Sequence, residues 1–259
     1  MLEDLKGKIA LVTGIANKRS ISFAVAQGLK AQGVRLALTY LPLDKDGAAD
    51  KFKTLTEALA PELVMPLDVA DEASMAAVFQ QIQKTMGGLQ VFIHSIASAK
   101  RGELDGKFSD ITQDGYLYAH QISSYSLISL VRHAKPLLQA SGGSVVTLSY
   151  IGAERAVKNY NVMGSAKAAL EANVRYLAME MGPDNIRVNA VSAGPIRTLS
   201  SAGVKDFLNL MHNAKEHSPL QRDLEPAEVA NMVTFLSSNA ASGVTGQTIY
   251  VDCGYNIHG

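Results

Sequence analysis

Residues 8–21 read KIALVTGIANKRSI and join an apolar run, a turn and the opening of a helical pattern. The run at 8–13 is short and β-branched, which is typical of a buried strand. From Ser20 to Gln32, apolar side chains recur at spacings of three and four, which indicates a helix that ends before Gly33. A strand that passes directly into a helix is the first half of a crossover between parallel strands.

The same alternation continues along the chain. Strands are predicted at 8–13, 34–40, 63–69, 91–96, 144–150, 186–192 and 247–252, and helices at 20–32, 50–60, 72–86, 113–139, 160–181 and 226–237. Because crossovers between parallel strands are right-handed, this order predicts an α/β fold of Rossmann type, a doubly wound seven-stranded parallel sheet with helices on both faces. We expect one domain over residues 1–259, with its ligand at the carboxyl edge of the sheet.

Composition limits which partners and which cellular location are expected for the chain. The chain has 24 basic and 24 acidic side chains, so no overall field draws it to nucleic acid or to an anionic membrane. No apolar run approaches the roughly 20 residues that cross a bilayer, and residues 1–7 lack the regions of a signal peptide. Cys253 is the single cysteine and forms no internal disulfide, as is usual in a reducing compartment. We therefore expect a cytoplasmic protein with no nucleic-acid or membrane partner.

The turn after the first strand is a candidate phosphate-binding site at a helix N-terminus. Dinucleotide-binding turns usually carry three glycines so that backbone amides can close on the pyrophosphate, but only Gly14 is present here. Ser20 can replace that chemistry with a hydroxyl donor to phosphate. Its position before the apolar helix suits a helix N-cap equally well, so this turn alone does not decide between the two roles.

Two further strand ends favour a dinucleotide. Asp68 lies near the end of the third predicted strand, where a carboxylate can accept a hydrogen bond from an adenine amino group, although Asp at such a place is usually a turn residue. The fourth strand ends in HSIA at 94–97, where small residues let a flat ring pass close to the backbone. Each signal is weak by itself, but together they predict a nicotinamide cofactor.

The end of the second strand bears on the choice of cofactor. NAD-specific enzymes often place an acid there to bind the ribose, and NADP-specific enzymes often place a base. Tyr40 is followed by neither at once, and Asp44, Lys45 and Asp46 come slightly later. Because no cationic cluster is present for a 2′-phosphate, we expect NADH/NAD rather than NADPH.

Tyr160 and Lys167 are the candidate catalytic pair, and a second tyrosine, Tyr150, ends the fifth strand. Two helical turns separate Tyr160 from Lys167 and bring them to one face. An ammonium beside a phenol lowers the pKa of the phenol, which makes the tyrosine a proton donor or an anion-stabilising partner near neutral pH. In an isolated pair of this kind, the tyrosine and the lysine more often share a helical face by chance, and Lys167 would then be solvated and Tyr160 partly buried. The predicted cofactor-binding turns favour the catalytic interpretation of this pair.

With these motifs the chain resembles the short-chain dehydrogenase/reductases, which combine Tyr-x6-Lys with a glycine turn after a strand. More narrowly, it is similar to the bacterial enoyl-acyl-carrier-protein reductases. Their first turn is longer and ends in Ser-Ile, here Ser20-Ile21, and His94-Ser95-Ile96 follows their pattern after the fourth strand. Tyr150 stands where relatives carry a catalytic serine. The runs LSYIGAERA at 148–156 and SAGPIRT at 192–198 also read like that family, and the similarity covers nearly the whole chain.

The resemblance implies an activity and the residues that serve it. The activity is NADH-dependent reduction of the trans-2 double bond of an enoyl thioester, the last step of the type II fatty-acid elongation cycle. The implied catalytic residues are Tyr150, Tyr160 and Lys167. The implied cofactor residues are Gly14, Ser20, Ile21, Asp68, Val69, Ile96, Lys167, Ile196, Arg197, Thr198, Leu199 and Ser200, and the implied acyl-site residues are Ala99, Tyr150, Tyr160, Met163, Val204 and Phe207.

The resemblance also implies partners. An acyl-carrier protein would deliver the substrate beside the helix after Thr198, where this chain offers Lys205. The long helices at 113–139 and 160–181 would pack across twofold axes in a homotetramer, and both offer apolar surface.

A helical flap at about 198–216 is expected to cover the acyl chain, and Gly203 with its small neighbours would permit hinging. Close relatives often have an aromatic residue where this chain has Ser98, so we expect the acyl pocket to be more open there.

Two other functions are weighed against the reductase. A carbonyl (3-oxoacyl) reductase of the same fold would normally need a serine or threonine donor where this chain has Tyr150. A non-catalytic dinucleotide sensor would have no need of Tyr160 and Lys167 in register. Activity with enoyl and with ketoacyl thioesters separates all three.

Overall fold

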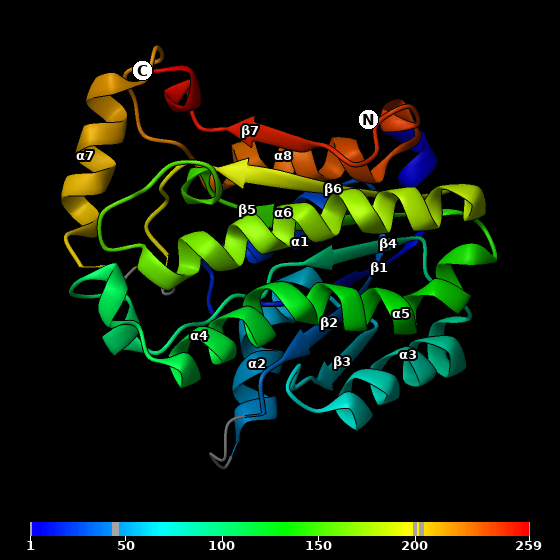
Figure 1. Ribbon diagram of the computed structural model, residues 1–259. Helices are drawn as coiled ribbons and strands as arrows, with labels where there is room; N and C mark the ends of the chain where they lie inside the picture. The colour runs from blue at the N-terminus through cyan, green and yellow to red at the C-terminus, as the bar shows by residue number, and fades with distance from the viewer. Residues whose placement is uncertain (1, 43–46, 199–200, 202–204, 259) are drawn as a thin grey trace.

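The computed structural model describes residues 2–42, 47–198, 201 and 205–258, and these form a sheet between two layers of helices (Figure 1). Seven parallel strands make one sheet in the order β3-β2-β1-β4-β5-β6-β7. The strands are β1 (Ile9–Val12), β2 (Arg35–Tyr40), β3 (Leu63–Pro66), β4 (Val91–His94), β5 (Gly143–Ser149), β6 (Ile186–Ala193) and β7 (Thr248–Val251). Within the described ranges the α-helices are α1 (Ile21–Ala31), α2 (Ala48–Thr56), α3 (Glu72–Met86), α4 (Gln113–His120), α5 (Ser126–Gln139), α6 (Asn161–Met181), α7 (Phe207–His217) and α8 (Pro226–Ser237). The predicted fold class is confirmed.

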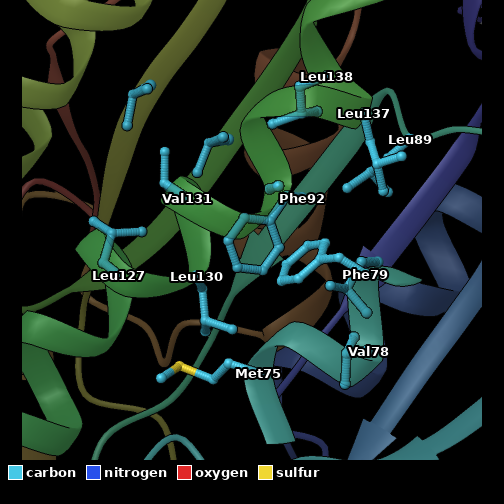
Figure 2. Packing of buried hydrophobic residues seen from close by; sticks show 14 of the residues in the cluster. Met75, Val78, Phe79, Leu89, Phe92, Leu127, Leu130, Val131, Leu137 and Leu138 are labelled. Atoms are coloured by element: carbon cyan, nitrogen blue, oxygen red, sulfur yellow. The ribbon is translucent and has the colours of Figure 1, made fainter. Parts of the chain in front are cut away.

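The sheet separates two apolar layers. On one face α3, α5 and α6 cover the strands, and Figure 2 shows Phe92 of β4 with Phe79 of α3 and Leu130 of α5 packed around it. The rings of Phe79 and Phe92 meet edge to face, with centroids 6.1 Å apart. On the other face lie α1 and α8, and α2 contributes Phe52. Because both faces are covered, every residue of β1 is buried, which explains its unbroken apolar run.

The ends of α3 and α8 coincide with the predicted helices at 72–86 and 226–237. Asp71 caps α3 by accepting an N–H of its first turn. Glu225 and Glu228 form a capping box at the start of α8. Local side chains therefore determine where these two helices begin.

The predicted helix at 113–139 is wrong in one respect, because a π-helical turn, Gln121–Tyr125, joins α4 to α5. A π turn makes room for one extra residue in an α-helical run. Ser123 and Ser124 in this turn are buried, and each makes hydrogen bonds to chain segments outside the helix. These tertiary bonds accompany the change from α-helix to π-helix. Helical periodicity in the sequence does not reveal them.

The third and fourth predicted strands are also wrong at their carboxyl ends. β3 ends at Pro66 and β4 at His94, earlier than the predicted 69 and 96. After β3 the Asp68 carboxylate accepts a backbone N–H two residues on and forms a turn. After β4 the Ser95 N–H bonds to the side chain of Thr13 instead of continuing the sheet. The other five strands agree with prediction to within one residue at each end.

Two helical predictions differ in extent. The helix predicted at 50–60 is α2, which ends at Thr56 and passes into a short 3-10 turn, Glu57–Leu59. The flap predicted at 198–216 contains α7, which begins only at Phe207. Leu199, Ser200, Gly203 and Val204 lie outside the described residues, so their predicted roles are not tested by the structure. None of the helices in the described ranges is both long and apolar enough to cross a membrane.

Candidate active site

The candidate site lies at the carboxyl edge of the sheet, where the turns after β1 and β4 touch. The strand order reverses at β1, which leaves a ligand crevice between these strand ends. Gly14 has a φ of +80°, and a Cβ at this position would stand 1.8 Å from the Ser95 carbonyl oxygen. The Thr13 hydroxyl donates to the Ile93 carbonyl (3.0 Å) and accepts from the Ser95 N–H (3.2 Å), which holds the two turns together. Position 14 therefore requires glycine on both conformational and steric grounds.

Ser20 closes the first turn instead of capping the helix. It occupies the N-cap position of α1, but its side chain makes no cap bond. Its Oγ accepts from the N–H groups of Ala16 (3.1 Å) and Asn17 (3.0 Å), which folds the turn back on itself. No acceptor in the described part of the chain takes the hydroxyl proton, so it is free to donate to a phosphate at the start of α1. Ser20 therefore stands at the N-cap position that the alternative expected but makes no side-chain cap bond, and its phosphate role stays a prediction.

Asp68, the predicted adenine partner, has the turn role that was weighed against ligand binding. One carboxylate oxygen accepts from the Ala70 N–H at 2.9 Å, which is the turn role. The side chain is only half-buried, so the other oxygen can reach a ligand. Val69 beside it is buried in the apolar layer under α3 and contributes a wall.

The remaining predicted cofactor residues follow the carboxyl ends of β4 and β6. Ile96 is half-buried and Ile196 is buried, whereas Arg197 is exposed. Thr198 and Ser201 exchange hydrogen bonds between side chains and backbone, with Thr198 N–H donating to the Ser201 hydroxyl at 2.8 Å. This reciprocal pair fixes the chain where the predicted flap begins.

His94 ends β4 in a buried position and joins three elements. Its Nδ1 lies 2.8 Å from Thr147 Oγ1 of β5, and its Nε2 lies 2.9 Å from Ser126 Oγ of α5. Ser126 gives its own proton to the Ile122 carbonyl (2.6 Å), so Nε2 carries the imidazole proton and Nδ1 accepts from Thr147. Burial and the charge of Lys167 lower the pKa of His94 to about 3, so the ring is neutral and structural.

Tyr150 and Tyr160 lie against each other at the end of β5. Their ring centroids are 4.8 Å apart and their planes are inclined at 65°. Glycine makes this contact possible, because a Cβ at Gly152 would stand 2.5 Å from Cδ1 of Tyr160. A Cβ at Gly164 of α6 would come 2.9 Å from the Gly152 carbonyl oxygen. Two glycines thus let α6 and the turn after β5 approach closely and hold Tyr160 between them.

Lys167 lies in α6, two helical turns after Tyr160. It is buried, whereas a chance pairing of the two residues would leave it solvated. Its side chain is 6% exposed, and Nζ donates to the Leu148 carbonyl oxygen at 2.6 Å. Burial lowers the pKa of Lys167 to about 8, against the opposing charge of Glu171. An ammonium has three protons, so two remain for a ligand among the described contacts.

The expected effect of Lys167 on the phenol of Tyr160 is wrong for this structure. Burial, followed by the neighbouring Tyr150 and Glu171, raises the pKa of Tyr160 well above its usual value. The ammonium of Lys167 is directed at a backbone carbonyl instead of the phenol. Burial and the proximity of Tyr255 likewise raise the pKa of Tyr150. Both phenols are therefore protonated near neutral pH, which is the form that donates a hydrogen bond.

Two asparagines that flank Tyr160 were missed by the sequence reasoning. Asn159 has a φ of +64° and Asn161 a φ of +33°, in the left-handed region that non-glycine residues seldom occupy. Asn159 Nδ2 donates to the Lys205 carbonyl (3.0 Å), and Asn161 Nδ2 donates to the Gly106 carbonyl (3.4 Å). Strained backbone that persists at a site is often part of the function. Asparagine on both sides of Tyr160 was the available signal, because this residue tolerates positive φ.

The predicted acyl-site residues Ala99, Tyr160 and Met163 meet in a small apolar cluster with Leu104. Tyr150 joins it through its contact with Tyr160. Phe207, at the start of α7, is half-buried and stands outside this cluster.

The last residues of the chain tie the turn after Tyr150 to α7. The guanidinium of Arg155 donates to the carbonyls of Asn256 and His258. Tyr255 OH accepts from Asn213 Nδ2 of α7 at 3.2 Å. The carboxyl-terminal segment therefore links two parts of the site that are far apart in sequence.

Comparison with known proteins identifies the family. Residues 14–256 match the family described as Enoyl-(Acyl carrier protein) reductase. The chain belongs to this family. It is 48% identical to the NADH enoyl-acyl-carrier-protein reductase FabI of Synechocystis sp., over 99% of both chains. It is 46% identical to the NADPH FabI of Staphylococcus aureus, over 98% of each.

Solved enoyl reductases have the same fold. The Bacillus cereus enoyl-acyl carrier protein reductase with NADP+ and indole naphthyridinone matches with a TM-score of 0.94 and 44% identity, over 99% of both chains. The Anaplasma phagocytophilum reductase in complex with NAD matches with a TM-score of 0.93 and 40% identity, over 98% of this chain and 96% of that one. The family predicted from the sequence is confirmed.

Proposed function

We propose that this chain is an NADH-dependent enoyl-acyl-carrier-protein reductase that converts a trans-2-enoyl thioester into the saturated acyl thioester in fatty-acid elongation. The observation that carries the proposal lies at the end of β5, where the ring of Tyr150 packs against that of Tyr160 and the Leu148 carbonyl accepts from the buried Lys167. Family membership over residues 14–256 supports the same activity.

The residues present fit a nicotinamide dinucleotide. Gly14 lets the turn after β1 lie against the Ser95 backbone at the start of α1, and the Ser20 hydroxyl has its proton free among the described contacts. Asp68 can accept from the adenine amino group, and Lys167 can donate to the nicotinamide ribose. Ile21, Val69, Ile96, Ile196, Arg197 and Thr198, with Leu199 and Ser200 beyond the described residues, complete the proposed contacts. When bound, the reduced cofactor supplies the hydride.

Tyr160 is the proposed hydrogen-bond donor to the thioester oxygen. Negative charge develops on that oxygen as the β-carbon accepts a hydride, and a preorganised donor stabilises such charge by about 3 kcal/mol. The raised pKa of Tyr160 keeps its proton in place until that charge appears. Tyr150 orients the thioester, and Lys167 holds the local potential positive. Ala99, Met163, Val204 and Phe207 are proposed to line the acyl chain.

A carbonyl reductase of the same fold is the second candidate, and the contacts of Ser149 argue against it. Such an enzyme needs a hydroxyl donor beside the catalytic tyrosine. Ser149 is the serine nearest in sequence to Tyr150 on this strand, but it is buried and its Oγ donates to the Glu171 carboxylate at 2.5 Å. The Ser149 hydroxyl is therefore not available as a donor to a substrate carbonyl.

The test follows the absorbance of the reduced cofactor with a crotonyl thioester and with an acetoacetyl thioester in parallel. Rapid NADH oxidation with crotonyl thioester alone supports the enoyl reductase. Preference for acetoacetyl thioester would establish the carbonyl reductase, and binding of NADH without oxidation by either would establish a dinucleotide sensor.

Several further features belong to the proposal. The acyl-carrier protein is proposed to dock beside α7, although Lys205 lies 3.2 Å from Asp105 and part of its charge is already paired. Exposed apolar side chains on the predicted interface helices, such as Leu117 and Met179, support a homotetramer. One domain over 1–259 with a flap at about 198–216, and a cytoplasmic location, remain predictions from the sequence.

A further inference from the structure

The π-helical turn between α4 and α5, with the first residue of α5, carries three serines that each bond to a different part of the chain. Ser126, just after the turn, holds His94 at the end of β4. Ser124 accepts from Asn173 Nδ2 of α6 at 3.0 Å. Ser123 bonds to Ser98, in the segment after β4. This short stretch therefore connects β4, α6 and the segment at 96–99.

Ser123 binds both backbone polar groups of one residue. Its Oγ accepts from the Ser98 N–H at 2.9 Å and donates to the Ser98 carbonyl at 3.0 Å. The Ser123 side chain is fully buried, so no water competes for these bonds. The same hydroxyl lies 3.6 Å from the sulfur of Met163, in the proposed acyl site. One oxygen atom thus holds Ser98 to the π turn, beside Met163 of α6.

The π turn is what gives Ser123 this position while α4 and α5 keep their own contacts. One added residue rotates the following helix face by about 100°. The wider turn is stabilised by side-chain donors to its carbonyls, from Ser126 Oγ to Ile122 (2.6 Å) and from Asn173 Nδ2 to Ser124 (3.4 Å). The turn is thus supported from inside the helix and from α6.

The segment held by Ser123 carries residues of the proposed cofactor and acyl sites. Ile96 precedes Ser98 and Ala99 follows it, and Ala99 packs in the cluster with Tyr160 and Met163. A hydride passes only when donor and acceptor carbons are aligned, and a displacement of about 1 Å can slow such a step 100-fold. A hydrogen bond that fixes this segment therefore helps to keep the hydride donor and acceptor carbons aligned.

We propose that Ser123 is a positioning residue for hydride transfer, acting through its paired bonds to the backbone of Ser98. The inference rests on the proposed function. It assigns to the π turn the task of holding the segment at 96–99, and Ser123 acts through the backbone of Ser98.

The test compares Ser123→Ala with Ser129→Ala. Ser129 is equally buried and lies in α5, but its hydroxyl donates to Glu72, away from the site (2.9 Å). Both variants lose one buried hydrogen-bonding group from the same helical run. We expect Ser123→Ala to lower kcat with crotonyl thioester about 10- to 100-fold, with the Kd for NADH within about threefold of wild type, whereas Ser129→Ala keeps kcat within about twofold.

An isotope effect separates positioning from loss of structure. With NADH deuterated at the transferred position, Ser123→Ala should show a larger isotope effect on kcat than wild type, because hydride transfer becomes slower than the other steps. A fall in kcat without this rise would indicate a structural role and overturn the proposal, as would an unchanged kcat. Ser123→Cys, which conserves volume, should reproduce the loss if the alanine variant folds poorly. A wild-type protein inactive with crotonyl thioester would instead contradict the proposed function.

Discussion

Tyr160 lies edge-on against Tyr150, with ring centroids 4.8 Å apart, so the two phenols form one surface at the end of β5. Both pKa values are raised by burial, and both side chains can therefore donate. The arrangement makes a division of labour between the two hydroxyls testable.

Tyr160→Phe removes one hydroxyl and keeps the ring packing. Enoyl reduction should fall by about 10- to 1,000-fold through loss of one transition-state hydrogen bond, while the Kd for NADH is unchanged. Tyr150→Phe should act mainly on KM for the thioester. Steady-state kinetics with the carrier-bound substrate measures both effects. Full activity of Tyr160→Phe would transfer the donor role to Tyr150, and the double variant should then be inactive.

Lys167 should make cofactor binding depend on pH. Its pKa of about 8 means that it is charged below this pH and neutral above it. The Kd for NADH should rise above pH 8, by at most about tenfold per pH unit for a single proton. Fluorescence titration between pH 6.5 and 9.5 measures it, and Lys167→Met should bind weakly with no such dependence. An equal slope in both proteins would exclude Lys167 as the titrating group.

Gly14→Ala should abolish the cofactor turn. The new methyl group would meet the Ser95 carbonyl in a backbone conformation that alanine avoids, so NADH binding should weaken by at least about 100-fold. Gly102→Ala is the control, because a Cβ there meets nothing within 4 Å and its φ is ordinary. Calorimetry would record both. If Gly14→Ala binds NADH like wild type, the turn is not the pyrophosphate site.

The predicted flap at about 198–216, which contains α7, should become resistant to proteolysis when the cofactor and an acyl ligand bind. Arg155→Ala, which breaks the contact between the turn after Tyr150 and the carboxyl-terminal segment, should speed cleavage within 205–217 in the free protein. Arg35→Ala, whose partner Glu62 lies at the other end of the sheet order, is the control. Cleavage rates that ligands leave unchanged would contradict the flap.

NADH should be preferred to NADPH in kcat/KM. No lysine or arginine directly follows Tyr40, although relatives differ, since the Synechocystis protein is named for NADH and the S. aureus protein for NADPH. Asp44, Lys45 and Asp46 lie outside the described residues. Initial rates with both cofactors decide the matter, and equal or better efficiency with NADPH would refute the preference.

Sequence periodicity predicted the sheet because buried parallel strands such as β1 are apolar throughout, and caps such as Asp71 mark helix starts. Residue type was enough to propose site residues such as Gly14 and Lys167. It was not enough where function depends on tertiary bonds. Ser123 reaches a residue 25 positions away, and the pKa of Tyr160 depends on burial that spacing does not reveal.

The carboxyl-terminal segment has a practical consequence for handling the protein. Because the carbonyls of Asn256 and His258 bind Arg155, and Tyr255 bonds to α7, this end of the chain is built into the region around the site. An affinity tag fused at this end would lie beside these bonds. Purification tags and surface immobilisation therefore belong at the amino terminus, where Leu2 precedes β1 at the opposite edge of the sheet from Tyr150.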